Sequence, residues 1–308
     1  MNLASLSKYK ITVIGDLMID EYWSGQVNRI SSEAPVPIIK IDENRYRVGG
    51  AGNVAMNLRA LGVNARLVSC IGKDKESSII KRLLKKNKVS TIFTFSKNKK
   101  IIKKLRILGN NQQILRADFE EDHKNYIVHK NQKIINCIKT SDVVIFSDYN
   151  KGSLSKIEEF IKLANKYKKI IIVDPKGNDF KKYKNATTLT PNLAEFTNIV
   201  GEAKNNNQII KKGKKLIKEL NLKSLIVTKG DKGMTIISKN KSLNLQSVTQ
   251  EVYDVTGAGD TVIAAVSTFL AIGKDIFEAA NFANKAASIS VKKIGTSVVT
   301  IKELKKLA

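Results

Sequence analysis

The chain has 308 residues, 42% of them hydrophobic, and carries a formal net charge of +26 at pH 7. This length and apolar content suffice for a sizeable core in one large domain or two small ones, so the fold should need no covalent cross-links. Two cysteines, Cys70 and Cys137, lie far apart without Cys-x-x-Cys or Cys/His spacing. They therefore indicate neither a disulfide framework nor a zinc site.

The N-terminal segment and the apolar runs bear on where the protein works. Lysines stand where a signal peptide would need its apolar stretch, and no apolar run reaches the ~18 residues that a membrane span requires. We therefore expect a cytoplasmic protein without a membrane partner.

The excess positive charge is spread over many segments. In residues 79–90 and 209–223, lysines fall between apolar positions at helical spacing, which is typical of the solvated faces of amphipathic helices. No zinc-finger, RNP or helix-turn-helix signature accompanies the charge. A basic surface alone gives only salt-sensitive, sequence-independent attraction, so no specific nucleic-acid partner is expected. A basic nucleic-acid-binding protein nevertheless stands as an alternative of a different class.

Short apolar runs alternate with longer amphipathic segments along the chain. The expected strands are 10–16, 65–72, 142–149, 168–177, 186–192 and 223–230, and the clearest helices are 51–62, 153–167 and 192–201. This alternation predicts an α/β fold with a mostly parallel sheet covered by helices on both faces. In such sheets, ligands gather at the carboxyl ends of the strands.

Two segments break the alternation. Residues 23–48 have period-two patterning and contain Pro35 and Pro37, which belong at sheet edges. Residues 90–119 indicate several short antiparallel strands around a Gly-Asn-Asn turn at 109–111. Together they predict a small β-sheet lid, from about 17–48 and 90–120, on a single domain that spans 1–308.

The stretch EVYDVTGAGDTVIAA places small residues directly before Asp260 and an apolar run. A glycine-rich loop that opens a helix presents unpaired N–H groups, with the positive end of the helix dipole behind them, and so cradles an anion. A carboxylate beside a bound phosphate is best explained as a general base, which together with the loop indicates phosphoryl transfer to a hydroxyl. The alternative is that Asp260 merely caps the helix.

Two motifs, DVTGAGD and VGGAGNVAMNLRALG (48–62), resemble the C-terminal and N-terminal signatures of the ribokinase-like (PfkB) carbohydrate kinases. Other stretches, among them GDLMIDEYW, SDYNKGSL and DPKGNDFKKYKNATTLTPNLAEF, resemble the D-glycero-D-manno-heptose 7-phosphate kinases of that family. The resemblance implies a ribokinase-like fold and ATP-dependent phosphorylation of D-glycero-β-D-manno-heptose 7-phosphate at C1, for ADP-heptose and lipopolysaccharide-core synthesis. Another sugar or sugar-phosphate kinase of the same fold is the nearest alternative.

The resemblance also assigns catalytic and nucleotide-side roles. It makes Asp260 the base, and Gly257, Ala258 and Gly259 the anion hole. It places the following residues near ATP: Asn192, Leu193, Ala194, Glu195, Thr228, Lys229, Gly230 and Asn284. Glu195 would meet Mg²⁺ through the phosphates or water, unless it is only a first-turn helix acid. A monovalent-cation requirement is left open.

On the acceptor side, the resemblance implies that Asp16, Asp20, Gly49, Gly50 and Asn53 hold the sugar. The alternative for Asp16 is an ordinary strand-end turn residue. The phosphate of the sugar needs cations, because charge-assisted donors bind phosphate best. The candidates by residue type and strand-end position are Arg106, Lys176, Arg116 and Lys151.

Two further expectations concern the whole protein. Lid strands commonly pair between subunits in the family that the chain resembles, so a homodimer is expected. The sequence contains no His-x-Gly-His segment, which predicts that the chain has no nucleotidyltransferase domain and performs only the kinase step.

Overall fold

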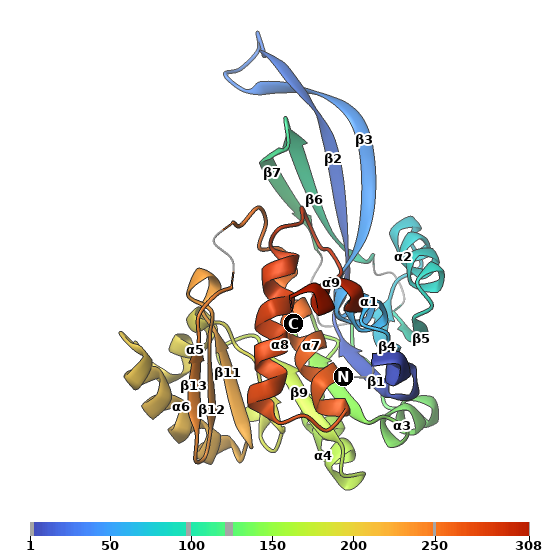
Figure 1. Ribbon diagram of the computed structural model, residues 1–308. Coiled ribbons are helices and arrows are strands. Elements are labelled where there is room, and N and C mark those ends of the chain that lie inside the picture. Colours follow the sequence, from blue (N-terminus) through green and yellow to red (C-terminus); the bar gives the residue numbers. More distant parts are fainter. Residues whose placement is uncertain (1–2, 97–99, 121–125, 249–250, 308) are drawn as a thin grey trace.

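The computed structural model describes residues 3–96, 100–120, 126–248 and 251–307. Its centre is a nine-stranded sheet with the order β13-β12-β11-β10-β9-β8-β1-β4-β5 (Figure 1). Those strands are β1 (Lys10–Gly15), β4 (Asn64–Ile71), β5 (Ser90–Phe95), β8 (Val143–Ser147), β9 (Ile170–Asp174), β10 (Thr188–Leu189), β11 (Ser224–Thr228), β12 (Met234–Ser238) and β13 (Ser242–Leu245). The run from β5 to β11 is parallel, and β12 and β13 are antiparallel additions at one edge.

Helices cover both faces of this sheet, as the alternation of strands and helices predicts. One face carries α1 (Ala51–Ala60), α2 (Lys75–Lys86), α7 (Ala258–Ala271), α8 (Ile276–Ser290) and α9 (Ile301–Lys306). The other carries α3 (Gln132–Lys139), α4 (Ile157–Lys166), α5 (Leu193–Val200) and α6 (Asn206–Leu220). Successive side chains of a strand point to opposite faces, so β1 sends Ile11 and Val13 into the first core and Ile14 into the second.

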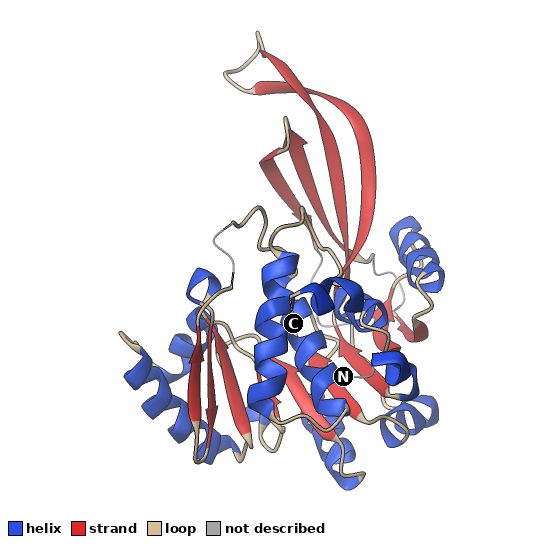
Figure 2. Ribbon diagram, in the orientation of Figure 1, coloured by secondary structure: helices blue, strands red, loops and turns tan. Residues whose placement is uncertain are grey.

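A second sheet stands away from this body (Figure 2). It consists of β2 (Leu17–Ile30), β3 (Pro37–Gly50), β6 (Ile102–Gly109) and β7 (Gln112–Phe119), in the order β3-β2-β6-β7. Pro37 opens the edge strand β3, in keeping with the expectation for proline. The turn between β6 and β7 contains Asn110 and Asn111 with φ of 51° and 66°, the left-handed conformation that asparagine tolerates. We call this four-stranded sheet the lid.

The expected extent of the lid is partly wrong. Residues 90–95 were expected in it, but β5 pairs in parallel with β4 at the edge of the main sheet. The lid is also not wholly antiparallel, because β2 and β6 run parallel. The apolar pattern of a short segment does not reveal which strand it pairs with; in the structure, Ile92 and Phe93 of β5 pack against the two opposite cores of the main sheet.

The cysteines and the helices bear on two expectations from the composition. Cys70 is buried, Cys137 is half-buried, and both are free thiols. Among the residues described, no helix combines the length and apolar character needed to cross a membrane.

Candidate active site

The start of α7 faces open space, as an anion-binding loop requires. Gly257 precedes the helix with φ of 80°, and a Cβ there would lie 2.7 Å from Nδ2 of Asn53. A Cβ on Gly259 would meet nothing within 4 Å. First-turn N–H groups have no intrahelical acceptor. The N–H of Ala258 donates to the Val255 carbonyl oxygen over 3.1 Å, so the helix start offers its other first-turn donors to a ligand that approaches through this space.

The Asp260 carboxylate is only 3% exposed and is held by two neutral donors. Nδ2 of Asn53 donates to Oδ2 over 2.7 Å, and the Tyr149 hydroxyl donates to Oδ1 over 2.7 Å. Burial raises the pKa of Asp260 to about 6, although both hydrogen bonds oppose the rise. A carboxylate with this pKa is ionised at neutral pH and still basic enough to accept a proton.

The Asn53–Asp260 hydrogen bond joins two motifs that lie 207 residues apart. Asn53 is held in turn by its neighbours in α1, where Nδ2 of Asn57 donates to the Asn53 carbonyl oxygen over 3.1 Å. Helices α1 and α7 pack side by side on the same face of the sheet. The first-core packing therefore fixes the orientation of the buried acid.

The two acids expected near the sugar differ in what they bind. Both oxygens of Asp16 accept main-chain N–H groups, Oδ2 from Tyr149 and Lys151 and Oδ1 from Ser153, over 2.9–3.0 Å. Burial nevertheless raises the pKa of Asp16. Asp16 thus anchors the loop after β8, and its role toward the sugar stays a prediction. Asp20 instead lies in the lid strand β2, where it forms a buried ion pair with Arg106 of the neighbouring strand β6.

Gly49 and Gly50 allow the chain to pass close to these acids. A Cβ on Gly49 would lie 2.5 Å from Oδ2 of Asp20, and one on Gly50 would lie 2.4 Å from the Asp16 carbonyl oxygen. Gly50 also has φ of 58°, which favours glycine. Side chains at either position would displace the acids.

The four candidate phosphate ligands do not converge. Arg106 is 6% exposed and paired with Asp20, and Arg116 pairs with Asp118 over 3.0 Å. Lys151 contacts Glu120 over 2.7 Å. The Lys176 ammonium lies 2.7 Å from Oε1 of Glu195, on the side expected for the nucleotide. The structure therefore separates Lys176 from the arginines of the lid.

Asn192 and Glu195 form a capping box at the start of α5. The Asn192 side chain accepts from the Glu195 N–H, and Oε2 of Glu195 accepts from the Asn192 N–H, both over 2.9 Å. Leu193 and Ala194 are the first residues of the helix. Glu195 thus caps the helix and also pairs with Lys176.

A cavity of about 140 Å³ joins the start of α7 to the end of β11. Its lining includes Thr228, Gly230, Ala258, Gly259 and Asn284, together with apolar residues such as Val252 and Val255. Nδ2 of Asn284 donates to the Gln246 carbonyl oxygen over 2.7 Å. Lys229 does not line this cavity, because its ammonium binds the side-chain oxygens of Asn206 and Asn244. Of the predicted nucleotide residues, Thr228, Gly230 and Asn284 therefore line this cavity, whereas Lys229 and the residues at the start of α5 (Asn192, Leu193, Ala194 and Glu195) do not.

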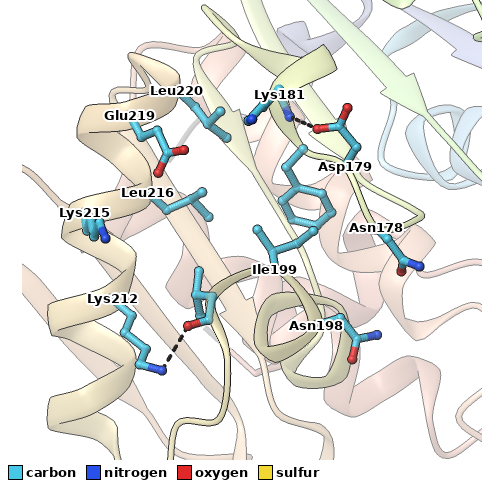
Figure 3. A pocket seen from close by; sticks show the side chains of 12 residues that line it. Asn178, Asp179, Lys181, Asn198, Ile199, Lys212, Lys215, Leu216, Glu219 and Leu220 are labelled. Carbon is cyan, nitrogen blue, oxygen red and sulfur yellow. Dashed lines mark hydrogen bonds between the residues drawn. The ribbon is translucent and has the colours of Figure 1, made fainter.

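A larger cavity lies elsewhere. About 400 Å³ in volume, it is bounded by the loop before η3 (Lys181–Tyr183), the end of α5 and one face of α6 (Figure 3). The Lys212 ammonium donates to the Val200 carbonyl oxygen over 2.9 Å. None of the residues predicted from the sequence to bind substrate or nucleotide lines it.

Tyr149 and Asp174 are two site residues that the sequence did not identify. Tyr149 contacts the acid directly, and burial, followed by the charge of Asp260, raises the pKa of its hydroxyl well above the usual value. Burial and then the nearby carboxylates of Asp260 and Glu195 hold the pKa of Asp174 well above its ordinary value. Tyr149 follows the carboxyl end of β8 and Asp174 is the last residue of β9, so strand-end position was an available signal.

This fold and this helix start define a class of protein. Residues 8–303 match the pfkB family of carbohydrate kinases, and the chain belongs to that family. The structure has the ribokinase-like fold. It superposes on the ribokinase of Arabidopsis thaliana, complexed with ribose and ATP, with a TM-score of 0.80 at 21% identity, covering 97% of this chain and 98% of that one. For phosphofructokinase-2 of Escherichia coli, in complex with potassium, the TM-score is 0.79 at 18% identity, with 97% of each chain covered.

Curated relatives are much more similar in sequence. The bifunctional protein HldE of Haemophilus influenzae (strain PittEE) is 45% identical over 303 residues, which are 98% of this chain and 64% of the relative. The bifunctional protein HldE of Psychromonas ingrahamii is 44% identical over 309 residues, with 99% of this chain and 64% of the relative covered. The chain thus spans about two thirds of the length of the relatives that it matches.

Proposed function

We propose that this carbohydrate kinase transfers the γ-phosphoryl group of ATP to the C1 hydroxyl of D-glycero-β-D-manno-heptose 7-phosphate. The product would be the 1,7-bisphosphate, an intermediate on the way to ADP-heptose and the lipopolysaccharide core. Support comes from the similarity to HldE over nearly the whole chain and from the heptose-kinase stretches of the sequence. The observation that carries the proposal is the hydrogen bond from Asn53 to Asp260, which places both family motifs in one site.

The proposed mechanism uses the side chains in the places described. Asp260 accepts the proton of the C1 hydroxyl while that oxygen forms its bond to the γ-phosphorus and the bond to ADP breaks. Asn53 and Tyr149 hold the carboxylate toward the acceptor. The N–H groups at Gly257 and Gly259, and that of Ala258 once it leaves the Val255 carbonyl oxygen, stabilise charge on the migrating phosphoryl group. Gly49, Gly50 and Asp20 line the acceptor side, and closure of the lid excludes water that would hydrolyse ATP.

The nucleotide is proposed to bind along the cavity between Thr228, Gly230 and Asn284. Its phosphates would then point to the start of α7 and to Asn192 at the start of α5. When bound, Mg²⁺ neutralises phosphate charge. Among the residues described, no three His, Cys, Asp or Glu side chains cluster as metal ligands. A single carboxylate, Glu195, fits this ion because Mg²⁺ at nucleotide sites keeps phosphate and water ligands.

The decisive experiment replaces the base. In Asp260→Asn, turnover of ATP with the heptose 7-phosphate should fall ~10²–10⁴-fold, the usual contribution of a positioned base. The matched control is Asp275→Asn: Asp275 also begins a helix, where Oδ1 caps the N–H groups of Phe277 and Glu278, and asparagine caps equally well. Near-normal turnover in Asp260→Asn would contradict the mechanism.

The choice of acceptor needs a separate test, because related kinases share this fold. A panel of sugars and sugar phosphates, including ribose, fructose 6-phosphate and tagatose 6-phosphate, should be assayed with ATP at equal concentrations. We expect the highest kcat/KM with the heptose 7-phosphate. A better substrate outside the heptoses would leave the kinase assignment intact and replace its acceptor.

The domain organisation and the oligomeric state are also proposals. We propose that residues 1–308 act as one kinase domain. Two copies are proposed to associate through their lids, where several large apolar side chains are exposed: Ile30, Val36, Ile41, Ile114, Leu115 and Phe119.

A further inference from the structure

The two faces of the lid are chemically different. Register pairs Asp20 of β2 with Lys104 of β6, and Lys104 with Asp118 of β7. One step along the same face, Tyr22 pairs with Arg106, which pairs with Arg116. Because side chains alternate between faces, these residues share one side of the lid.

This face, which we call the inner face of the lid, looks toward the candidate active site. The hydroxyl of Tyr22 accepts the N–H of Thr296, and Nη1 of Arg47 donates to the carbonyl oxygens of Ile294 and Thr296. Both contacts tie the face to the loop after α8. The other face turns to α2, where Lys103 lies 3.4 Å from both Glu21 and Glu76.

The charges on the inner face do not balance. Arg106 is paired with Asp20, and Arg116 with Asp118. Arg47 binds main-chain carbonyl oxygens and packs over the ring of Tyr22. Within the described part of the chain, the half-buried ammonium of Lys104 has no carboxylate at ion-pair distance. Cation charge on this face therefore exceeds carboxylate charge.

An uncompensated, partly buried ammonium is costly unless an anion joins it. Burial lowers the pKa of Lys104, as do the neighbouring arginines, although Asp20 and Asp118 act in the other direction. The positive charge of Lys104 also opposes the rise that burial causes in the pKa of Asp260, although the two side chains form no ion pair. An acceptor that presents its hydroxyl to Asp260 and carries a phosphate at its far end would bring that phosphate toward Lys104.

We propose that Lys104 binds the phosphate of the acceptor, so that the inner face of the lid selects phosphorylated sugars. This inference rests on the proposed function and deepens it. It also replaces the candidates chosen from the sequence: Arg106 and Arg116 are already paired with acids of the lid, and Lys176 stands beside Glu195. Arg106 and Arg116 contribute to the field around the phosphate, whereas the ammonium of Lys104 is its direct partner.

The test compares Lys104→Met with Lys103→Met. Methionine keeps an apolar stem of similar length and removes only the ammonium, and Lys103 is the adjacent lysine on the other face. Binding of the heptose 7-phosphate is measured by calorimetry without nucleotide, and KM for sugar phosphate and for ATP by steady-state assay. We expect Lys104→Met to weaken sugar-phosphate binding and raise its KM by about 10- to 100-fold. KM for ATP should stay within about twofold, as should all constants of Lys103→Met.

The outcomes separate this inference from the proposed function. Unchanged sugar-phosphate affinity in Lys104→Met, with wild-type protein binding and turning over the heptose 7-phosphate, would refute the role of Lys104 alone. A rise in the KM for ATP as large as that for the sugar would also refute it, because the ammonium would then serve the nucleotide. Wild-type protein that prefers unphosphorylated sugars would overturn both. Lys104→Arg should restore part of the affinity, and thermal unfolding checks that each variant is folded.

Discussion

At the scale of single residues, the environment of Asp260 predicts a pH dependence. The pKa of this carboxyl group is raised from 3.8 to about 6 by burial. A base works only when deprotonated, so activity is retained above this pKa and lost below it. We expect kcat/KM to fall about tenfold per pH unit below pH 6. A profile that stays flat to pH 5 would show that Asp260 is not the titrating base.

Tyr149 should act on the same profile as a positioning residue. Its hydroxyl donates to Oδ1 of Asp260 and thereby stabilises the ionised form. In Tyr149→Phe, the acidic limb of the profile should move to higher pH, and kcat should fall by about 10-fold or more, because one of two orienting donors is lost. Tyr167→Phe, a half-buried tyrosine that follows α4, is the control. An unmoved acidic limb would mean that Tyr149 only fills space.

The sequence identified the residues of the site better than their partners. Gly257, Gly259 and Asp260 stand in one short motif, so their local geometry follows from the loop and helix start that this motif encodes. The contacts of Arg106 and Lys176 depend instead on side chains 86 and 19 residues away. Such pairings are set by strand register and packing, which residue type alone does not reveal. Tyr149 was overlooked because its only distinctive feature is its position after a strand.

At the scale of elements, the first turn of α7 predicts opposite effects of two similar substitutions. Gly257→Ala should lower the stability by about 1–2 kcal/mol, because alanine is strained at positive φ and its Cβ would press on Asn53. Gly259→Ala adds its Cβ in open space within a helix and should raise the stability by about 0.5–1 kcal/mol. Thermal and urea unfolding measure both. Equal effects would mean that the two glycines share one conformation.

Six of the nine strands of the main sheet were predicted, because their apolar runs are short, rich in β-branched residues and mostly separated by clear helices; β12 and β13 were not predicted. The lid was predicted less well. Its segments share alternating patterns with β5, and only the pairing of β5 with Arg66–Ile71 assigns that strand to the main sheet. A local hydrophobic pattern does not reveal pairing partners that lie far along the chain.

At the scale of the whole molecule, the exposed apolar residues of the lid predict a dimer. Ile30 and Ile41 are 64% and 42% exposed on the long hairpin of β2 and β3. Aspartate at both positions should prevent association, because burying a carboxylate without a partner is costly. Analytical ultracentrifugation should find wild-type dimers and monomers of Ile30→Asp/Ile41→Asp. Wild-type protein that sediments as a monomer at micromolar concentration would refute the dimer.

Helix α7 is buried without interruption from Asp260 to Phe269 and packs between α1 and α8. During synthesis, every partner of this helix in α1 and the parallel strands leaves the ribosome before it does. The apolar residues on that side of the sheet therefore stay uncovered until a late helix arrives, and that helix also carries the proposed base and phosphate-binding turn. A chain that stops before α7 thus lacks both part of its core and the residues proposed for catalysis.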